Sequence, residues 1–150
     1  MAKISKEEKE LRKLTVEMRF LEQTAETLQQ RVSMITAAIT DLTYASMTLE
    51  GIEKEKEDAE LLVPIGGSSY IKAKLATTDK VVVGIGAGVS VEKTLQEAKT
   101  IVKERLDELE KTMASVQQQF AQVADRINAD RNRFESLLAK VREGKTLGDA

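Results

Sequence analysis

Residues 61–91 read LLVPIGGSSYIKAKLATTDKVVVGIGAGVSV, the one stretch of this chain whose pattern is typical of β-structure. Runs of glycine, serine and threonine divide it into short apolar segments, as in strands joined by tight turns. We therefore predict four strands forming two hairpins, at 61–65, 69–75, 81–85 and 87–91. Two hairpins of this size bury too little apolar surface to be stable alone. The stretch thus indicates assembly with another chain.

The second predicted strand has one apolar face. Ile71, Ala73 and Leu75 lie on that face, because successive side chains of a strand point to opposite sides. Tyr70 and two lysines lie on the other face, so we expect a half-buried strand. Pro64 has no amide hydrogen to donate, which predicts that the first strand is an edge strand.

The segment Gly84-Ile85-Gly86-Ala87-Gly88 invites comparison with a phosphate-binding loop. The dinucleotide fingerprint G-x-G-x-x-G would need a glycine where Val89 stands, and no Gly-Lys-Ser/Thr follows. A tight turn with a bulge between two short strands is the better interpretation.

A long heptad-patterned segment precedes the β stretch, and we predict a helix over 5–51. Ser5 and Glu8 have the spacing of a capping box, and Gly51 suits a helix C-cap. Apolar residues follow steps of three and four, which predicts a left-handed coiled coil. They are Leu11, Leu14, Met18, Leu21, Ala25, Leu28, Val32, Ile35, Ile39, Leu42 and Leu49, with Ser46 at the position between the last two. The charged run at 52–60 is expected to be a solvated connector.

A second helix is predicted over 92–143, followed by a flexible tail at 144–150. Ser90 is a candidate N-cap, and Thr94 with Glu97 forms a capping box one turn later. Asp130 interrupts the apolar stripe near its end. The stripe comprises Leu95, Ala98, Val102, Leu106, Leu109, Met113, Val116, Phe120, Val123, Ile127, Phe134, Leu137 and Val141.

The expected fold class is α+β, mainly α: a long antiparallel two-helix coiled coil with two β-hairpins inserted between the helices. The first helix ends at the insert and the second begins there, so Gly51 should lie near Leu95. Moving away from the insert lowers one residue number as it raises the other, and the numbers of facing residues should therefore add up to about 146. Leu11 is then predicted beside Phe134 and Leu137, and Val16 beside Asp130.

Composition excludes several functional classes. The chain has 150 residues, no histidine and no cysteine, which removes histidine acid–base catalysis and Cys/His metal sites. Its formal net charge of −2 comes from interspersed charges, unlike the basic face of a nucleic-acid-binding protein. Paired carboxylates such as Glu57 and Asp58 lie in a solvated run without pocket-forming neighbours. We expect no enzyme activity, no cofactor and no metal, and a cytoplasmic protein without a membrane span or signal peptide.

The two glycine-bearing β motifs carry a resemblance to a known family. LVPIGGS at 62–68, the strand at 71–73 and VGIGAG at 83–88 leading into a helix resemble the alpha-class subunits of prefoldin, an archaeal and eukaryotic co-chaperone. The resemblance covers the whole chain, because the flanking coiled coils also match the family plan. Two hairpins instead of one point to the alpha class.

This resemblance implies a subunit of a hexamer of two alpha and four beta subunits, whose hairpins form a β-barrel platform. It implies an ATP-independent holdase that binds unfolded polypeptides at the coiled-coil tips and delivers them to the group II chaperonin. The implied partners are beta-class subunits, a second alpha subunit, unfolded clients and that chaperonin, with no nucleic acid and no membrane.

Candidate site residues follow from this interpretation. For client binding at the tips they are Ile4, Leu11, Leu14, Val16, Phe20, Phe134, Leu137, Leu138 and Val141. For assembly through the hairpins they are Leu62, Val63, Pro64, Ile65, Ile71, Ala73, Leu75, Val81, Val83 and Ile85. Met34, Tyr44, Met47 and Ile101 also lie off the stripes, and we expect them to pack against hairpins or a neighbouring helix.

Two alternatives remain at this point. A structural coiled-coil adaptor or tether would dock its β insert to one folded partner and ignore denatured proteins. A paralogous alpha-like prefoldin subunit would form homo-oligomers or filaments without a beta-class partner.

Overall fold

A computed structural model describes residues 5–148 of the chain, and their side chains as far as residue 145. The elements are helix α1 (Lys6–Glu53), strands β1 (Glu60–Gly66), β2 (Ser69–Lys74), β3 (Lys80–Gly86) and β4 (Val89–Thr94), and helix α2 (Leu95–Gly148). They form two compact units. The helical unit comprises the chain up to Ile35 and from Thr112 onward, and the hairpin unit is Thr36–Lys111. The predicted class, two long helices with two antiparallel hairpins between them, is confirmed.

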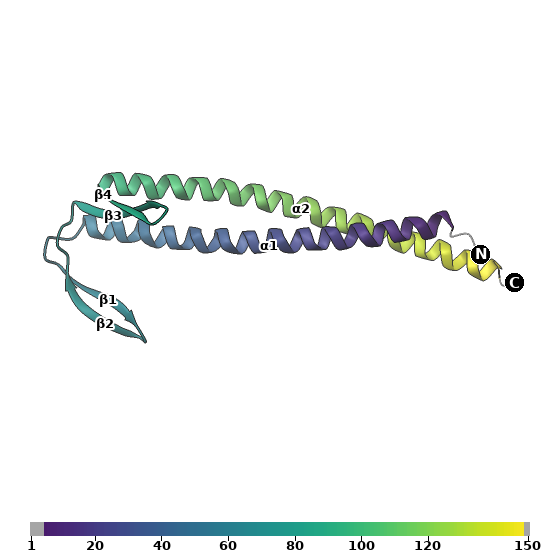
Figure 1. Ribbon diagram of the computed structural model, residues 1–150, viewed down its shortest axis with the longest axis horizontal. Coiled ribbons are helices and arrows are strands. Elements are labelled where there is room, and N and C mark those ends of the chain that lie inside the picture. The colour runs from purple at the N-terminus through teal and green to yellow at the C-terminus, as the bar shows by residue number, and fades with distance from the viewer. Residues whose placement is uncertain (1–4, 149–150) are drawn as a thin grey trace. The chain divides into compact units, whose positions relative to one another are not determined.

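In the helical unit α1 and α2 lie side by side and run antiparallel (Figure 1). Leu14, Leu28, Val116 and Leu137 are buried here, and each belongs to a predicted stripe. Two ion pairs one heptad apart join the helices. Glu10 accepts from Arg133 at 3.0 Å and Glu17 from Arg126 at 2.8 Å. The residue numbers of each pair add up to 143, close to the predicted register of about 146.

One prediction of this register is wrong. Val16 was expected beside Asp130, but its side chain is 69% exposed, whereas Asp130 is 6% exposed. The neighbouring Glu17 reaches Asp130 instead. On a helix, adjacent residues point about 100° apart, so a small error in register exchanges an inward for an outward position.

The core of the hairpin unit gathers apolar side chains from both helices and from β3. Leu49 of α1 packs with Leu95, Ala98 and Val102 of α2, and Val81 and Val83 are among the residues packed against them. Polar contacts support this core. The Arg105 guanidinium donates to the carbonyl oxygen of Gly84 at 2.7 Å, and Glu53 of α1 accepts from Gln96 at 3.0 Å and also pairs with Lys99. The β3–β4 hairpin is therefore fastened to the helices within this unit.

The hairpins are two separate two-stranded antiparallel sheets with the same turn (Figure 1). Gly67-Ser68 and Ala87-Gly88 form two-residue turns in which every φ is positive, between 51° and 75°. Such turns match the right-handed twist of hairpin strands. A register irregularity follows Gly84, with Gly86 at a φ of 116°. The turn-and-bulge interpretation of the glycine-rich segment is thus confirmed.

Several predicted boundaries differ from the structure. Gly51 is not a C-cap, since α1 continues to Glu53 and ends in hydrogen bonds of the i→i−3 type from Lys54 and Glu55. Ser90 is not an N-cap, because it pairs with Gly84 inside β4. The last strand extends to Thr94, and α2 reaches Gly148 instead of ending at 143. The capping box that follows is present: the Glu97 amide donates to Thr94 Oγ1 at 3.2 Å, and the Thr94 amide donates to Glu97 Oε2 at 3.3 Å. Of the two predicted N-caps, Thr94 and not Ser90 therefore starts α2.

Candidate functional surfaces

The β1–β2 hairpin presents apolar side chains on both of its faces. Leu61 pairs with Ala73 and Val63 with Ile71 on one face, while Leu62 and Pro64 lie on the other. Exposure is 65% for Leu62, 61% for Ile65, 60% for Tyr70 and 50% for Ile71. The predicted alternation in β2 is therefore present, but the chain itself does not bury its apolar face. A two-stranded sheet with both faces open needs a partner to cover it.

The β3–β4 hairpin has one covered and one open face. Val81 and Val83, predicted as assembly residues, pack against the core of their own unit. Val82 lies on the opposite face with 73% exposure, and Ile85 and Val89 beside the turn are 53% and 51% exposed. Val82, Val89, Leu61 and Tyr70 were missed as assembly candidates. Strand alternation alone could have separated Val82 from its two neighbours.

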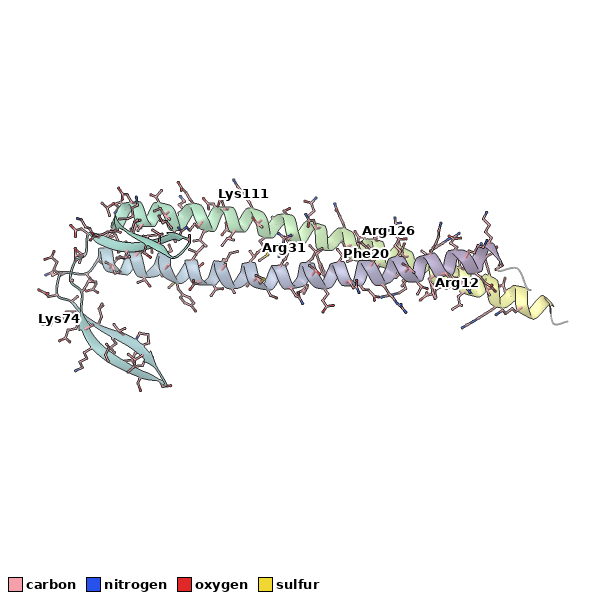
Figure 2. All side chains as sticks on the ribbon, in the orientation of Figure 1. Arg12, Phe20, Arg31, Lys74, Lys111 and Arg126 are labelled. Atoms are coloured by element: carbon pink, nitrogen blue, oxygen red, sulfur yellow. The ribbon has the colours of Figure 1, made fainter. Side chains whose placement is uncertain are left out.

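In the helical unit the predicted client-binding residues divide into a seam group and an exposed pair. The seam group is buried or half-buried and comprises Leu11, Leu14, Phe134, Leu137, Leu138 and Val141. Val16 and Phe20 are 69% and 67% exposed and lie one turn apart on α1. Phe20 projects from this part of α1 in Figure 2. Ile4 lies outside the described residues.

Asp130 is a charged group in the seam. Its carboxylate is 3.5 Å from the guanidinium of Arg126, and its Oδ2 has no hydrogen-bond partner among the described residues. Burial raises the pKa of Asp130, and the neighbouring Glu17 carboxylate raises it further, while Arg126 opposes both. A buried carboxylate that is only partly compensated weakens the helix pair at this level.

Three further apolar side chains of α1 are open. Met34 of the helical unit is 73% exposed. Tyr44 and Met47 of the hairpin unit are 65% and 62% exposed, so the hairpins of that unit do not cover these two side chains. Within residues 5–148 no helix is long and apolar enough to cross a membrane. The same residues contain no group of three or more Asp or Glu side chains placed to hold a metal ion.

Two long helices paired in antiparallel fashion, joined by two hairpins that leave apolar faces open, define a class of coiled-coil subunits. Comparison with known proteins narrows the class. Residues 21–140 match the family model described as prefoldin subunit. A prefoldin alpha subunit of Methanococcoides burtonii is 35% identical over 120 residues, covering 80% of this chain and 87% of the relative. One from Methanosarcina mazei is 31% identical over 148 residues, covering 97% and 99%.

A solved structure agrees with these relatives. The filamentous PFD of Methanocaldococcus jannaschii superimposes with a TM-score of 0.65 at 25% identity, over 75% of this chain and 93% of that chain. The chain belongs to the prefoldin family, as its β motifs indicated. It is a prefoldin-type chaperone subunit, in a family of chaperone subunits that are not enzymes.

Proposed function

We propose that this chain is the alpha-class subunit of an ATP-independent holdase. It holds unfolded polypeptides at the terminal end of its coiled coil, prevents their aggregation and passes them to the group II chaperonin in the cytoplasm. The observation that carries the proposal is the exposure of Val16 and Phe20, at 69% and 67%, on a helix whose other apolar residues in this region belong to the seam. Contiguous exposed apolar patches mark interaction surfaces, and these two side chains lie one turn apart near the terminal end of the coiled coil.

Asp130 supports the same proposal. A partly compensated buried carboxylate lowers the free energy needed to part the two helices nearby. Parting them would add Leu14 and Leu137 to the apolar surface offered to a client. Each contact would be weak, and several subunits acting on one client would bind it through their high effective concentration.

Assembly is proposed to proceed through the hairpins, with two alpha and four beta subunits forming a β-barrel platform. Leu62, Ile65 and Val82 would be covered in that platform. A homo-oligomer is the second candidate, favoured by the likeness to a filamentous PFD. Native mass with and without a beta-class subunit separates the two, because only the first candidate needs the second chain to complete its assembly.

The holdase is tested by light scattering from a chemically denatured protein diluted into buffer without ATP. The assembled complex should suppress scattering, and the double variant Val16→Ser/Phe20→Ser should suppress it less. Tyr44→Ser/Met47→Ser is the matched control, since these side chains are 65% and 62% exposed in the other unit. No suppression by the unchanged complex would favour an adaptor or tether. Equal suppression by all three would place the binding surface elsewhere.

A further inference from the structure

A groove at the start of α1 is positively charged. Lys6, Lys9, Arg12 and Lys13 line it, and the buried Leu14 contributes an apolar wall. Arg12 projects from this part of the helix in Figure 2. Among the residues that the structure describes, none of these four cations has a carboxylate within ion-pair distance. Their charges are therefore open to a ligand.

The two carboxylates that line the groove already form ion pairs. Glu10 pairs with Arg133 at 3.0 Å and Glu17 with Arg126 at 2.8 Å, and both arginines belong to α2. Since each carboxylate is matched by a cation across the seam, neither offsets the four cations beside it. What the groove offers to a ligand is positive charge.

The same face of α1 continues into the exposed apolar pair. Lys9, Lys13, Val16 and Phe20 follow one another at steps of three and four, so they line one side of the helix. Arg12 and Arg19 flank them. A cationic group therefore leads directly into a pair of large apolar side chains along a single exposed stripe.

The lysines at the start of α1 are not explained by helix stability. Lys6 and Lys9 lie in the first turns, where the helix macrodipole favours anions. Glu7 and Glu8 in the same turn supply the anions that the macrodipole favours, so the two lysines are tolerated there and remain available to a ligand with negative charge.

We infer that this stripe selects its polypeptides by charge, and that its preferred ligands are unfolded segments in which Asp or Glu stand beside large apolar residues. The carboxylates would pair with Lys9, Arg12 and Lys13, and the apolar side chains would contact Val16 and Phe20. The inference rests on the proposed holdase function and names its substrate class. A polypeptide fits better than a nucleic acid, because the stripe offers apolar side chains without an aromatic stacking row.

The test measures binding of three labelled, unstructured peptides to the full-length assembled complex by fluorescence anisotropy. The peptides share the same apolar residues and carry Glu, Gln or Lys at the remaining positions. The acidic peptide should bind about tenfold more tightly than the basic one at low salt, because several exposed charge pairs act together. High salt should reduce the difference.

A charge-reversal variant, Lys9→Glu/Arg12→Glu/Lys13→Glu, should invert the order of affinities. Circular dichroism checks that its helix forms, since the new glutamates at 12 and 13 stand four residues from Glu8 and Glu17. Arg31→Glu/Lys103→Glu/Lys111→Glu makes the same change in net charge outside the groove, at exposed positions, and should keep the original order.

The outcomes separate the two claims. If the complex prevents aggregation but binds all three peptides equally, the holdase stands and the charge preference is overturned. If it binds no peptide and prevents no aggregation, the proposed function itself fails. If polyglutamate or single-stranded RNA of equal charge binds as tightly as the acidic apolar peptide, the groove is a general polyanion site and the inference is overturned.

Discussion

Arg105 of α2 donates a hydrogen bond of 2.7 Å to the carbonyl oxygen of Gly84 in β3. The acceptor lies where the pairing of β3 with β4 becomes irregular. The contact therefore fastens the hairpin to the helix at the point where its own ladder is weakest. Arg105 acts here together with Val81 and Val83, which pack against the core of the same unit.

Replacing Arg105 by Met should loosen the β3–β4 hairpin. The side-chain stem can still pack, so the change isolates the hydrogen bond, whose loss should cost about 1 kcal/mol. Amide hydrogen exchange in β3 and β4 should become faster by about fivefold. The exchange rate of Arg105→Lys should lie between those of the unchanged protein and the Met variant. An unchanged rate in the Met variant would show that the apolar core alone holds the hairpin.

Asp130→Leu should stabilise the helical unit by about 1–3 kcal/mol, since it replaces a partly compensated buried carboxylate by an apolar seam residue. Arg126 keeps its ion pair with Glu17 in this variant. Thermal unfolding measures the gain, and Asp125→Leu, an exposed neighbour, should produce little change. If parting of the helices serves client binding, the stabilised variant should also hold clients less well.

The stability of the helical unit should rise as the pH falls from neutral into the acid range. The pKa of Asp130 is raised above the ordinary value of 3.8, so the folded state binds its proton more readily than the unfolded state does. The free energy of unfolding therefore decreases as pH rises between these two pKa values. Asp130→Asn should remove this dependence when urea unfolding is followed against pH.

The hairpin unit should respond to pH in the opposite direction. Hydrogen bonds from Lys99 and Gln96 lower the pKa of Glu53, which stabilises the folded state at neutral pH and is lost on acidification through the lowered pKa. In Glu53→Gln, the stability of the hairpin unit should decrease less on acidification. An identical pH response of the two units, measured by hydrogen exchange, would contradict this assignment of the charges.

Ala87→Gly should stabilise the second hairpin by about 0.5–1 kcal/mol. Ala87 has a φ of 51°, a left-handed conformation that costs a side chain with a Cβ atom but costs glycine little. The midpoint of urea unfolding should rise. Ala87→Val is the opposing control and should lower it, because β-branched residues fit this conformation worst.

Val82→Asp should prevent assembly without unfolding the subunit. The side chain is 73% exposed in the single chain, so the aspartate remains solvated there and would be desolvated only in a covered platform. Native mass should fall while the circular dichroism of the helices is retained. Val82→Ile should assemble normally, and full assembly of the aspartate variant would exclude this face from the interface.

Much of this structure was predictable because it depends on local patterns. The heptad stripes correctly identified the seam from Leu14 to Leu137, since helical periodicity alone decides which side chains face a partner helix. The glycine runs correctly located the first turn, but the second turn is Ala87-Gly88, just past the predicted break between strands 81–85 and 87–91. Helix ends were less predictable: Gly51 resembles a C-cap, yet α1 continues past it because Ile52 still packs on the hairpin-unit core.

The candidate site residues were likewise predictable only in part. Val16 and Phe20 were predictable as exposed from their positions off the first stripe, whereas Leu138, which lies off the second stripe, is half-buried. Strand alternation separates Val82 from Val81 and Val83, but it does not say which of the two faces is covered. Only the docking of β3 on α1 and α2 decides which of them is covered.

The sequence by itself determined the two long helices, their antiparallel pairing and the two hairpins, because these follow from the spacing of residues that are near one another along the chain. The tertiary structure decided which capping residue starts α2, which face of β3 is open, and that Glu17 instead of Val16 meets Asp130. These depend on the register between segments that are far apart in the chain. A shift of one residue in that register turns an inward side chain outward, and the local sequence pattern does not predict the register.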